Sequence, residues 1–193
     1  MDDRQHLNPP SILTAIENDT EAIGFGMASD RKTGSLLRVL AASKPGGRFL
    51  ELGTGTGISA AWILDGMDQA STLVTVDNDE SAVAVAKRHL GRDPRVTFCV
   101  ILGFEFLKSA TENRYDFLFA DTWPGKYDHL DEALQLLKPG GIYVVDDMLP
   151  QPSWPQDHAP KVPGLVAALE NRTDVVIVKL GWATGLIVAT KIR

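Results

Sequence analysis

Residues 51–59 have the sequence Glu51-Leu52-Gly53-Thr54-Gly55-Thr56-Gly57-Ile58-Ser59. Its glycines stand at alternate positions, between an apolar run and a helix-like segment. Because glycine lacks a Cβ atom, such a loop lets a ligand approach the backbone closely. A dinucleotide fingerprint has glycines at its first, third and sixth positions, and here the sixth position counted from Gly53 is Ile58. The loop therefore predicts a ligand site of another kind, with a plain glycine-rich turn as the alternative.

Short apolar runs and helical stretches alternate after this loop. The runs cover 48–52, 72–76, 95–101, 115–120 and 141–145. The helical stretches between them cover 58–66, 79–90, 104–110 and 127–137, and another helix is expected at about 29–43. Strands that alternate with helices form right-handed βαβ units and a parallel sheet. Nearly continuous apolar strands suit a sheet that helices cover on both faces.

The C-terminal end breaks this alternation. After a helix at 162–171, the segments 174–180 and 186–192 have the character of strands, joined by the short connection 181–185. A connection this short permits only antiparallel pairing. We therefore expect an α/β, Rossmann-like sheet of seven mostly parallel strands in the order 3-2-1-4-5-7-6. A C-terminal antiparallel hairpin completes it, and helices cover both faces.

Composition limits the class of protein. The chain has 193 residues and a mass of 21.0 kDa, which favours one domain over 1–193. Its net charge of −6 and sequence pI near 5.2 argue against a nucleic-acid partner, because phosphate neutralisation needs a basic surface. A lone cysteine, Cys99, excludes an intrachain disulfide and the thiol-ligated zinc motifs. The sequence has no run of 18 apolar residues, so no membrane partner is expected.

Two segments are expected to lie outside the regular elements. Residues 1–10 end in Asn8-Pro9-Pro10 and are expected to form a loose tail. They begin with acidic residues and lead into no apolar run, which argues against a signal peptide and favours a cytoplasmic location. The irregular segment 148–161 is long for a compact domain, and loops of this length are usually functional or mobile. We expect it to be the substrate loop.

Acidic residues follow three of the predicted strands. Asp77 ends the second strand, where a carboxylate can accept hydrogen bonds from both hydroxyls of an adenosine ribose; capping the next helix is the alternative role. Asp121 follows the fourth strand, and Asp146 and Asp147 follow the fifth. Asp121, Asp146 and Asp147 are expected to meet Glu51 in one cleft at the edge of the sheet, where a proton or a cation must offset their repulsion. Oxygen-only ligands suit magnesium, calcium or manganese, and a polar turn is the alternative.

The loop, with an acid before glycines at alternate positions, resembles the first motif of class I S-adenosylmethionine-dependent methyltransferases. Over roughly Met27 to Ile192, the chain is similar to a narrower group, the cation-dependent O-methyltransferases of the catechol and caffeoyl-CoA type. The resemblance implies contacts of Glu51 with the cofactor's ammonium group, of Ser59 with its carboxylate and of Trp123 with its adenine. The full set of cofactor-binding residues that it implies is Met27, Glu51, Gly53, Gly55, Gly57, Ser59, Asp77, Asn78, Phe104, Asp121 and Trp123.

The same resemblance implies a metal site and a catalytic pair. Asp121 falls on the first metal ligand of the family, and Asp146 and Asp147 fall on the Asp-Asn pair that completes its site. The family's lysine base stands three residues after the first ligand, where this chain has Pro124; the nearest lysine is Lys126. Asp121 and Lys126 are thus the expected catalytic residues.

The predicted function follows from these motifs. We expect methyl transfer from S-adenosylmethionine to a hydroxyl of a small-molecule acceptor, assisted by a divalent cation, with magnesium favoured. His158 in the 148–161 segment is an alternative general base. A metal-independent O- or N-methyltransferase and a non-catalytic cofactor-binding module are the rival functions, and the sequence leaves a homodimer open.

Overall fold

The computed structural model describes residues 2, 7–110, 114–152 and 154–193. The predicted tail at 1–10 therefore lies partly outside the described residues, as does position 153 of the predicted substrate loop. The strands are β1 (Arg48–Leu52), β2 (Thr72–Asp77), β3 (Val96–Val100), β4 (Tyr115–Ala120), β5 (Leu137–Val145), β6 (Val175–Leu180) and β7 (Leu186–Lys191). The helices are α1 (Leu13–Ala22), α2 (Arg31–Ala42), α3 (Ile58–Gly66), α4 (Glu80–Leu90), α5 (Gly103–Ser109), α6 (Leu130–Gln135) and α7 (Val162–Glu170), with a short 3₁₀ helix at Ala159–Lys161.

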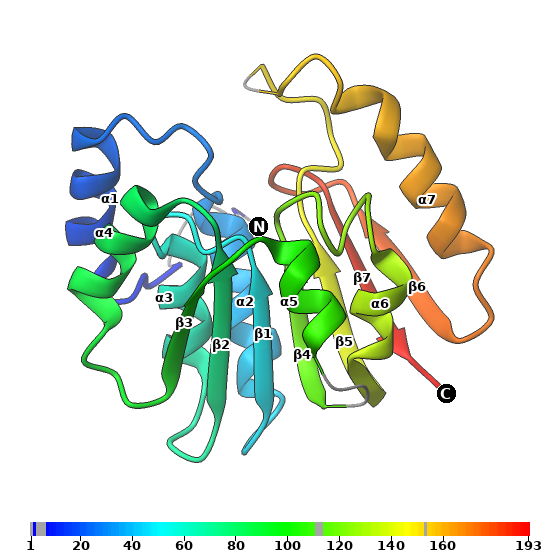
Figure 1. Ribbon diagram of the computed structural model, residues 1–193, viewed down its shortest axis with the longest axis horizontal. Coiled ribbons are helices and arrows are strands. Elements are labelled where there is room, and N and C mark those ends of the chain that lie inside the picture. The colour runs from blue at the N-terminus through cyan, green and yellow to red at the C-terminus, as the bar shows by residue number, and fades with distance from the viewer. Residues whose placement is uncertain (1, 3–6, 111–113, 153) are drawn as a thin grey trace.

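The strands form one sheet in the order β3-β2-β1-β4-β5-β7-β6, which confirms the predicted fold class (Figure 1). The pairs from β3 to β5 are parallel, while β7 is antiparallel to both β5 and β6. β1 lies between β2 and β4, so the order of the strands reverses beside it. In an open parallel sheet, a crevice for ligands forms at this point, beyond the carboxyl ends of the strands.

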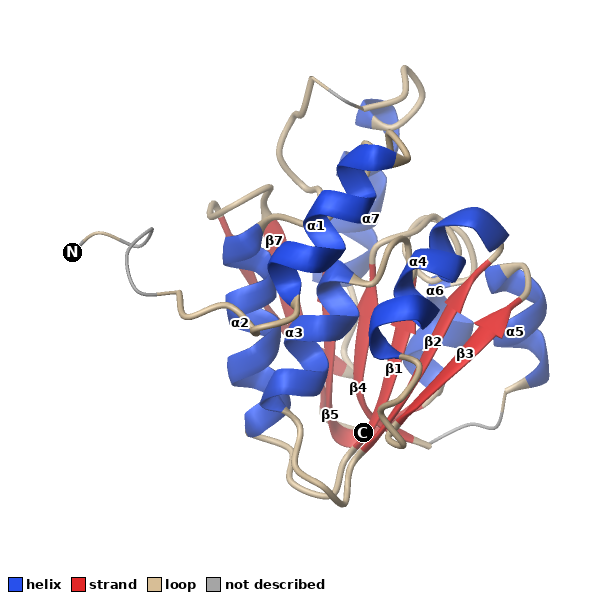
Figure 2. Ribbon diagram, turned by 90° about the vertical axis from the view of Figure 1, so that its left-hand side faces the viewer, coloured by secondary structure: helices blue, strands red, loops and turns tan. Residues whose placement is uncertain are grey.

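Helices cover both faces of the sheet, as predicted (Figure 2). Successive side chains of a strand point to opposite faces, so Phe49 and Phe117 pack under α1, α2 and α3, while Leu50 and Leu118 pack under α5, α6 and α7. These four side chains are fully buried. Glu51 has the same orientation as Phe49 and therefore lies on the face that α3 covers. No helix among the described residues is long and apolar enough to cross a membrane.

The predicted bounds of the 127–137 helix and the predicted start of the 141–145 strand are wrong. The helix expected at 127–137 is limited to α6, Leu130–Gln135, and β5 already begins at Leu137. The reason is a register shift in the pairing of β4 with β5: Tyr115 pairs with Leu137, whereas Phe117 pairs with Ile142. The Pro139-Gly140-Gly141 turn therefore lies inside the strand, where the sequence suggests a break between two elements.

Candidate active site

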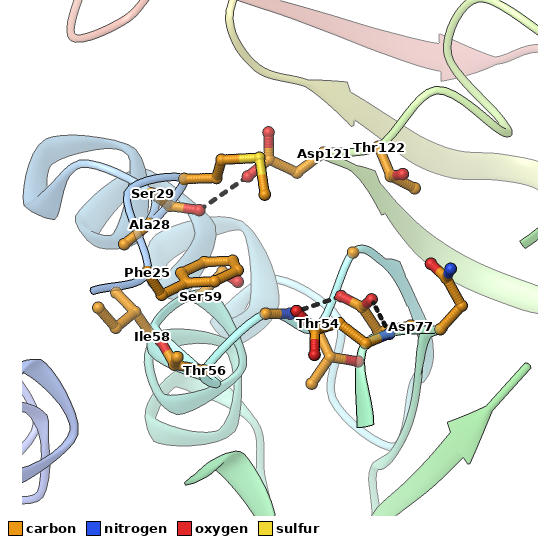
Figure 3. A pocket seen from close by; sticks show the side chains of 15 residues that line it. Phe25, Ala28, Ser29, Thr54, Thr56, Ile58, Ser59, Asp77, Asp121 and Thr122 are labelled. Carbon is orange, nitrogen blue, oxygen red and sulfur yellow. Dashed lines mark hydrogen bonds between the residues drawn. The ribbon is translucent and has the colours of Figure 1, made fainter. Parts of the chain in front are cut away.

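Two adjoining cavities lie beyond the carboxyl ends of β1, β2, β4 and β5. The first, here the glycine-loop cavity, is formed by the loop after β1, the end of β2 and the linker between α1 and α2. Its lining residues are Phe25, Met27, Ala28, Ser29, Gly53, Thr54, Gly55, Thr56, Ile58, Ser59, Asp77, Asn78, Asp79, Asp121 and Thr122 (Figure 3). Seven predicted cofactor residues, Met27, Gly53, Gly55, Ser59, Asp77, Asn78 and Asp121, are among them.

The glycine loop needs the conformational freedom of its glycines. Gly53, Gly55 and Gly57 have φ values of +104°, +49° and +91°, a region that side chains rarely adopt. A Cβ atom on Gly55 would lie 3.1 Å from ring atoms of Phe25, which lines the same cavity. A Cβ atom on Gly57 would lie 2.9 Å from the Cβ of Ala86 in α4. Gly57 thus permits close packing of α3 against α4, and it does not line the cavity.

Asp77 ties the end of β2 to the glycine loop. Its Oδ2 accepts a hydrogen bond of 2.8 Å from the backbone N–H of Gly55, and its Oδ1 accepts one of 3.0 Å from Asp79 (Figure 3). Capping of α4 is performed by Asp79, whose carboxylate accepts from the N–H groups of Ser81 and Ala82. Because each carboxylate oxygen has two lone pairs, the half-buried Asp77 retains acceptor capacity toward the cavity.

Glu51 lies beneath the cavity and does not line it. Its side chain is fully buried, and its Oε2 accepts a hydrogen bond of 2.5 Å from Thr75, which in turn accepts one of 2.6 Å from Thr54. Its Oε1 has no hydrogen-bond partner among the described residues. Burial raises the pKa of Glu51 to about 7, although hydrogen bonds from Ser59 and Thr75 oppose this shift. The predicted contact with an ammonium group stays a prediction, and Ser59 and Thr54 lie between the carboxylate and the cavity.

The raised pKa makes a prediction about stability. Glu51 titrates near 4.5 in the unfolded chain and near 7 in the folded one, so the native state binds the extra proton and loses stability as the pH rises between these values. The free energy of unfolding of Glu51→Gln, relative to that of the wild type, should therefore increase by about 3 kcal/mol from pH 4 to pH 8. Urea unfolding of the two apoproteins across this range measures the difference, with Glu105→Gln at an exposed site as the control. If the free energies of unfolding of the wild type and of Glu51→Gln changed in parallel with pH, the raised pKa of Glu51 would be contradicted.

The second cavity, here the tryptophan cavity, lies on the other side of Asp121. It shares Met27, Ala28, Ser29, Asp121 and Thr122 with the glycine-loop cavity. The rest of its lining consists of Gly26, Asp30, Trp123, Lys126, Asp146, Asp147, Gln151, Trp154, Pro155, His158 and Thr184. The two cavities thus have a common wall, formed by the linker between α1 and α2 and by the residues after β4.

The tryptophan cavity brings together the three predicted metal ligands and Lys126. The Oδ2 of Asp121 accepts a hydrogen bond of 3.0 Å from Ser29, while Asp146 accepts from the backbone N–H of Asp147 at 2.7 Å and from the hydroxyl of Thr184. Burial and the neighbouring carboxylates raise the pKa of Asp121, and burial raises that of Asp146 to about 6. Burial lowers the pKa of Lys126, and attraction to Asp121, Asp147 and Asp146 opposes this shift.

These carboxylates share a cavity without forming a set of ligands. Among the residues that the structure describes, no three side chains of histidine, cysteine, aspartate or glutamate are arranged to hold a metal ion. The oxygens of Asp121 and Asp146 are directed instead toward hydrogen-bond donors of the protein. The oxygen chemistry predicted from the sequence suits magnesium, but this arrangement does not fit the ion.

The predicted substrate loop is anchored at both ends. At its start, the N–H groups of Met148 and Leu149 donate to Gly185 and Thr184 in the connection between β6 and β7. Near its end, the buried His158 lies 2.8 Å from the hydroxyl of Tyr127. Trp154 stacks on His158, with ring centroids 4.1 Å apart. Loop residues thereby form one wall of the tryptophan cavity.

Two predicted cofactor residues lie outside the glycine-loop cavity in addition to Glu51 and Gly57. Trp123 lines the tryptophan cavity, and the ammonium of Lys161, which is not among the lining residues of that cavity, lies 4.6 Å from the ring centroid of Trp123. Phe104 lies on α5 and stacks against His129. Three residues that line these cavities are not predicted from the sequence: Phe25, Thr122 and Thr184. Thr122 adjoins Asp121 in the sequence, but Phe25 and Thr184 belong to connections without a recognisable pattern.

Comparison with known proteins identifies the family. Residues 50–148 match a family described as a methyltransferase domain. A protein of Mycobacterium ulcerans named "Putative O-methyltransferase" is 31% identical over 144 residues, covering 72% of this chain and 64% of the relative. The chain therefore spans slightly less than two thirds of that relative. A homologue from Mycolicibacterium smegmatis with a similar name is 31% identical and is covered over 68% of its length.

Solved structures have the same fold. One of them is an O-methyltransferase of Streptomyces achromogenes involved in tomaymycin synthesis, solved with S-adenosylmethionine. It superposes on this chain with a TM-score of 0.81 at 24% identity, and the superposition covers 95% of this chain and 90% of the other. An O-methyltransferase of Bacillus cereus, solved with S-adenosylhomocysteine, gives a TM-score of 0.82 at 20% identity, with 94% and 90% covered. From the match to the methyltransferase domain, the identity to these relatives and the shared sheet, we conclude that this chain belongs to the class I methyltransferase family.

Proposed function

We propose that this protein transfers the methyl group of S-adenosylmethionine to a hydroxyl of a small-molecule acceptor. The observation that carries the proposal is the wall shared by the two cavities, formed by Met27, Ser29 and Asp121. A cofactor in the glycine-loop cavity and an acceptor in the tryptophan cavity would meet across this wall. Methyl transfer is an in-line displacement, so its catalysis consists mainly of holding the two reactants in this alignment.

The residues of the glycine-loop cavity fit S-adenosylmethionine. Asp77 offers a carboxylate to the ribose hydroxyls, and the absence of a side chain on Gly55 leaves room for the methionine part beside the loop. Gly53 lets the loop pack against the backbone of Asp121, because a Cβ atom there would lie 3.1 Å from the Asp121 carbonyl oxygen. Ser59 offers a hydroxyl to the cofactor's carboxylate. The buried Glu51, whose Oε1 has no hydrogen-bond partner in the part of the chain that the structure describes, supports an ammonium group above it, reached through Ser59 or a water molecule. The bound cofactor supplies the electrophilic methyl group.

Cofactor selectivity and turnover test the proposal. Calorimetry should show binding of S-adenosylmethionine and none of NAD, because Ile58 stands where a dinucleotide loop needs its last glycine. Turnover is then measured with labelled cofactor on catechols, phenols and hydroxycinnamoyl thioesters. A labelled methyl ether supports O-methyl transfer, labelled amines favour the N-methyltransferase, and cofactor binding without turnover on any acceptor favours the non-catalytic module.

Replacing Asp77 tests the ribose contact separately. A hydrogen bond to a charged acceptor contributes about 1.5–3 kcal/mol, so Asp77→Ala should weaken binding of S-adenosylmethionine at least tenfold. Asp79→Ala is the matched control, because it removes the carboxylate that caps α4 from the same turn and should mainly reduce stability, by about 1 kcal/mol. Calorimetry gives the affinities and thermal melting the stabilities. An unchanged dissociation constant for folded Asp77→Ala would refute the contact.

A further inference from the structure

Lys126 is a buried cation within the tryptophan cavity. Its side chain is 2% exposed, and lysine is almost never buried to this degree unless a negative partner compensates its charge. Its ammonium group makes no hydrogen bond or ion pair shorter than 4.0 Å with another described residue. The nearest ring is that of Tyr127, with the centroid 5.0 Å from Nζ. The charge is therefore compensated at longer range, by the carboxylates that line the same cavity.

The backbone around Lys126 holds this side chain in place. Gly125 has a φ of +86°, and a Cβ atom there would lie 2.4 Å from Cδ1 of Leu52, so only glycine fits this turn. The carbonyl of Gly125 accepts a hydrogen bond of 2.7 Å from the buried hydroxyl of Tyr143. The N–H of Lys126 donates to the carbonyl of Trp123 at 3.1 Å. The turn is fixed from below by β1 and β5, which directs Lys126 to one place in the cavity.

The surrounding carboxylates lack the arrangement of a metal site, although they supply negative charge. Ser29 and Thr184 donate hydrogen bonds to Asp121 and Asp146, and these bonds orient the carboxylates. Asp147 lines the same cavity. Asp30 lines it too, so four carboxylates border the cavity, and a proton or a cation must offset their repulsion. Lys126 is the lysine or arginine side chain that lines the cavity among the described residues.

We propose that the ammonium of Lys126 is the resident cation of this active site, in place of a divalent metal ion, and that it binds the acceptor as an oxyanion. The inference rests on the proposed function. The acceptor hydroxyl releases its proton to solvent on binding, and Lys126 keeps its own. The oxyanion then forms the new C–O bond as the S–CH₃ bond breaks, and the sulfur retains the bonding electron pair, giving a methyl ether and S-adenosylhomocysteine.

This assignment specifies the acceptor. A single positive charge stabilises an oxyanion less than a divalent ion does, because the Coulomb energy scales with the charge. The acceptor must therefore have an acidic hydroxyl of its own, such as that of a phenol or an enol. Aliphatic alcohols, whose oxyanions form at far higher pH, should not be methylated. Phenol and cyclohexanol, which are similar in size, form the matched pair of acceptors.

Manganese binding tests the inference without any methyl transfer. Wild-type protein at about 0.1 mM is mixed with one equivalent of Mn²⁺. Its electron paramagnetic resonance spectrum should show the signal of free Mn²⁺. Lys126→Met removes the charge at similar length and should bind Mn²⁺ at least tenfold more tightly, whereas Lys126→Arg, which keeps the charge, should resemble the wild type. Stoichiometric Mn²⁺ binding by the wild type, lost in Asp146→Ala, would overturn the inference. The wild-type measurement decides even where Lys126→Met does not fold.

Turnover provides the second readout. The wild type should methylate an acidic phenol at the same rate with and without chelator, and Lys126→Met should lose at least 100-fold in kcat while its affinity for S-adenosylmethionine is unchanged. Loss of wild-type turnover on chelation, restored by magnesium, would overturn the inference and leave the proposed function intact. Absence of turnover on every acceptor would count against the proposed function, while the manganese measurement would still decide which cation the cavity holds.

Discussion

Gly55→Val is expected to abolish binding of S-adenosylmethionine. Gly55 has a φ of +49°, which a β-branched residue adopts only under strain, and its Cβ atom would lie 3.1 Å from the ring of Phe25. The two methyl groups of valine would extend into the space between the loop and that ring. Calorimetry at millimolar cofactor should detect no heat of binding, and the backbone strain should reduce stability by about 1–3 kcal/mol.

Gly46→Val separates strain from obstruction. Gly46 has a comparable φ of +66°, but no heavy atom of another described residue beyond its chain neighbours lies within 4 Å of the position of its Cβ, and Gly46 lines neither cavity. This control should therefore lose similar stability and bind the cofactor with wild-type affinity. Wild-type affinity in folded Gly55→Val would show that the cofactor does not occupy the space beside the glycine loop.

Asp146→Ala should nearly eliminate turnover while the affinity for S-adenosylmethionine is retained. Asp146 lines the tryptophan cavity and not the glycine-loop cavity. Its carboxylate accepts from the N–H of Asp147 and from Thr184, so it joins the end of β5 to the connection between β6 and β7. Removal of this carboxylate takes a negative charge from the surroundings of Lys126. It also leaves the N–H of Asp147 and the hydroxyl of Thr184 without this acceptor. We expect a loss of at least 100-fold in kcat, measured with labelled cofactor on a responsive acceptor.

Asp147→Asn is the conservative partner of this variant. Asp147 has a φ of +57°, a conformation that asparagine adopts at least as readily as aspartate. Asparagine also keeps the size of the side chain and one oxygen acceptor. Turnover of Asp147→Asn should stay within a fewfold of the wild type. A loss as large as that of Asp146→Ala would mean that the charge of Asp147 itself takes part in the reaction.

The sequence predicts the sheet well, because its signals are local. Each parallel strand is a short apolar run followed by a turn and a helix, and the connection Gly181–Gly185 is too short for anything but a hairpin. The end of α6 could not be predicted in the same way. Leu134, Leu136 and Leu137 continue an apolar helical pattern, and only the pairing of Leu137 with Tyr115 across the sheet makes it a strand residue.

The site is predictable where a residue follows a strand directly. Asp77, Asp121 and Asp146 lie at strand ends, and a parallel sheet brings such positions to one edge. The burial of Lys126 could not be read from the sequence, because lysine is normally exposed and its position depends on the turn fixed by Tyr143. The contact of Thr184 with Asp146 joins segments 38 residues apart and has no local signal.

The predicted substrate loop is held at its ends, which leaves its middle free to vary among proteins built on this scaffold. Met148 and Leu149 are fixed by backbone hydrogen bonds, and His158 is fixed by Tyr127, so the loop's path is determined at its ends. Side chains between these anchors, such as those of Gln151 and Pro155, line the tryptophan cavity, which is the acceptor site under the proposed function, and they do not belong to the hydrophobic core. Mutations there can change acceptor preference at little cost in folding. A randomised library confined to 150–152 and 154–157 should accordingly retain a high fraction of folded, cofactor-binding members while it samples new acceptors.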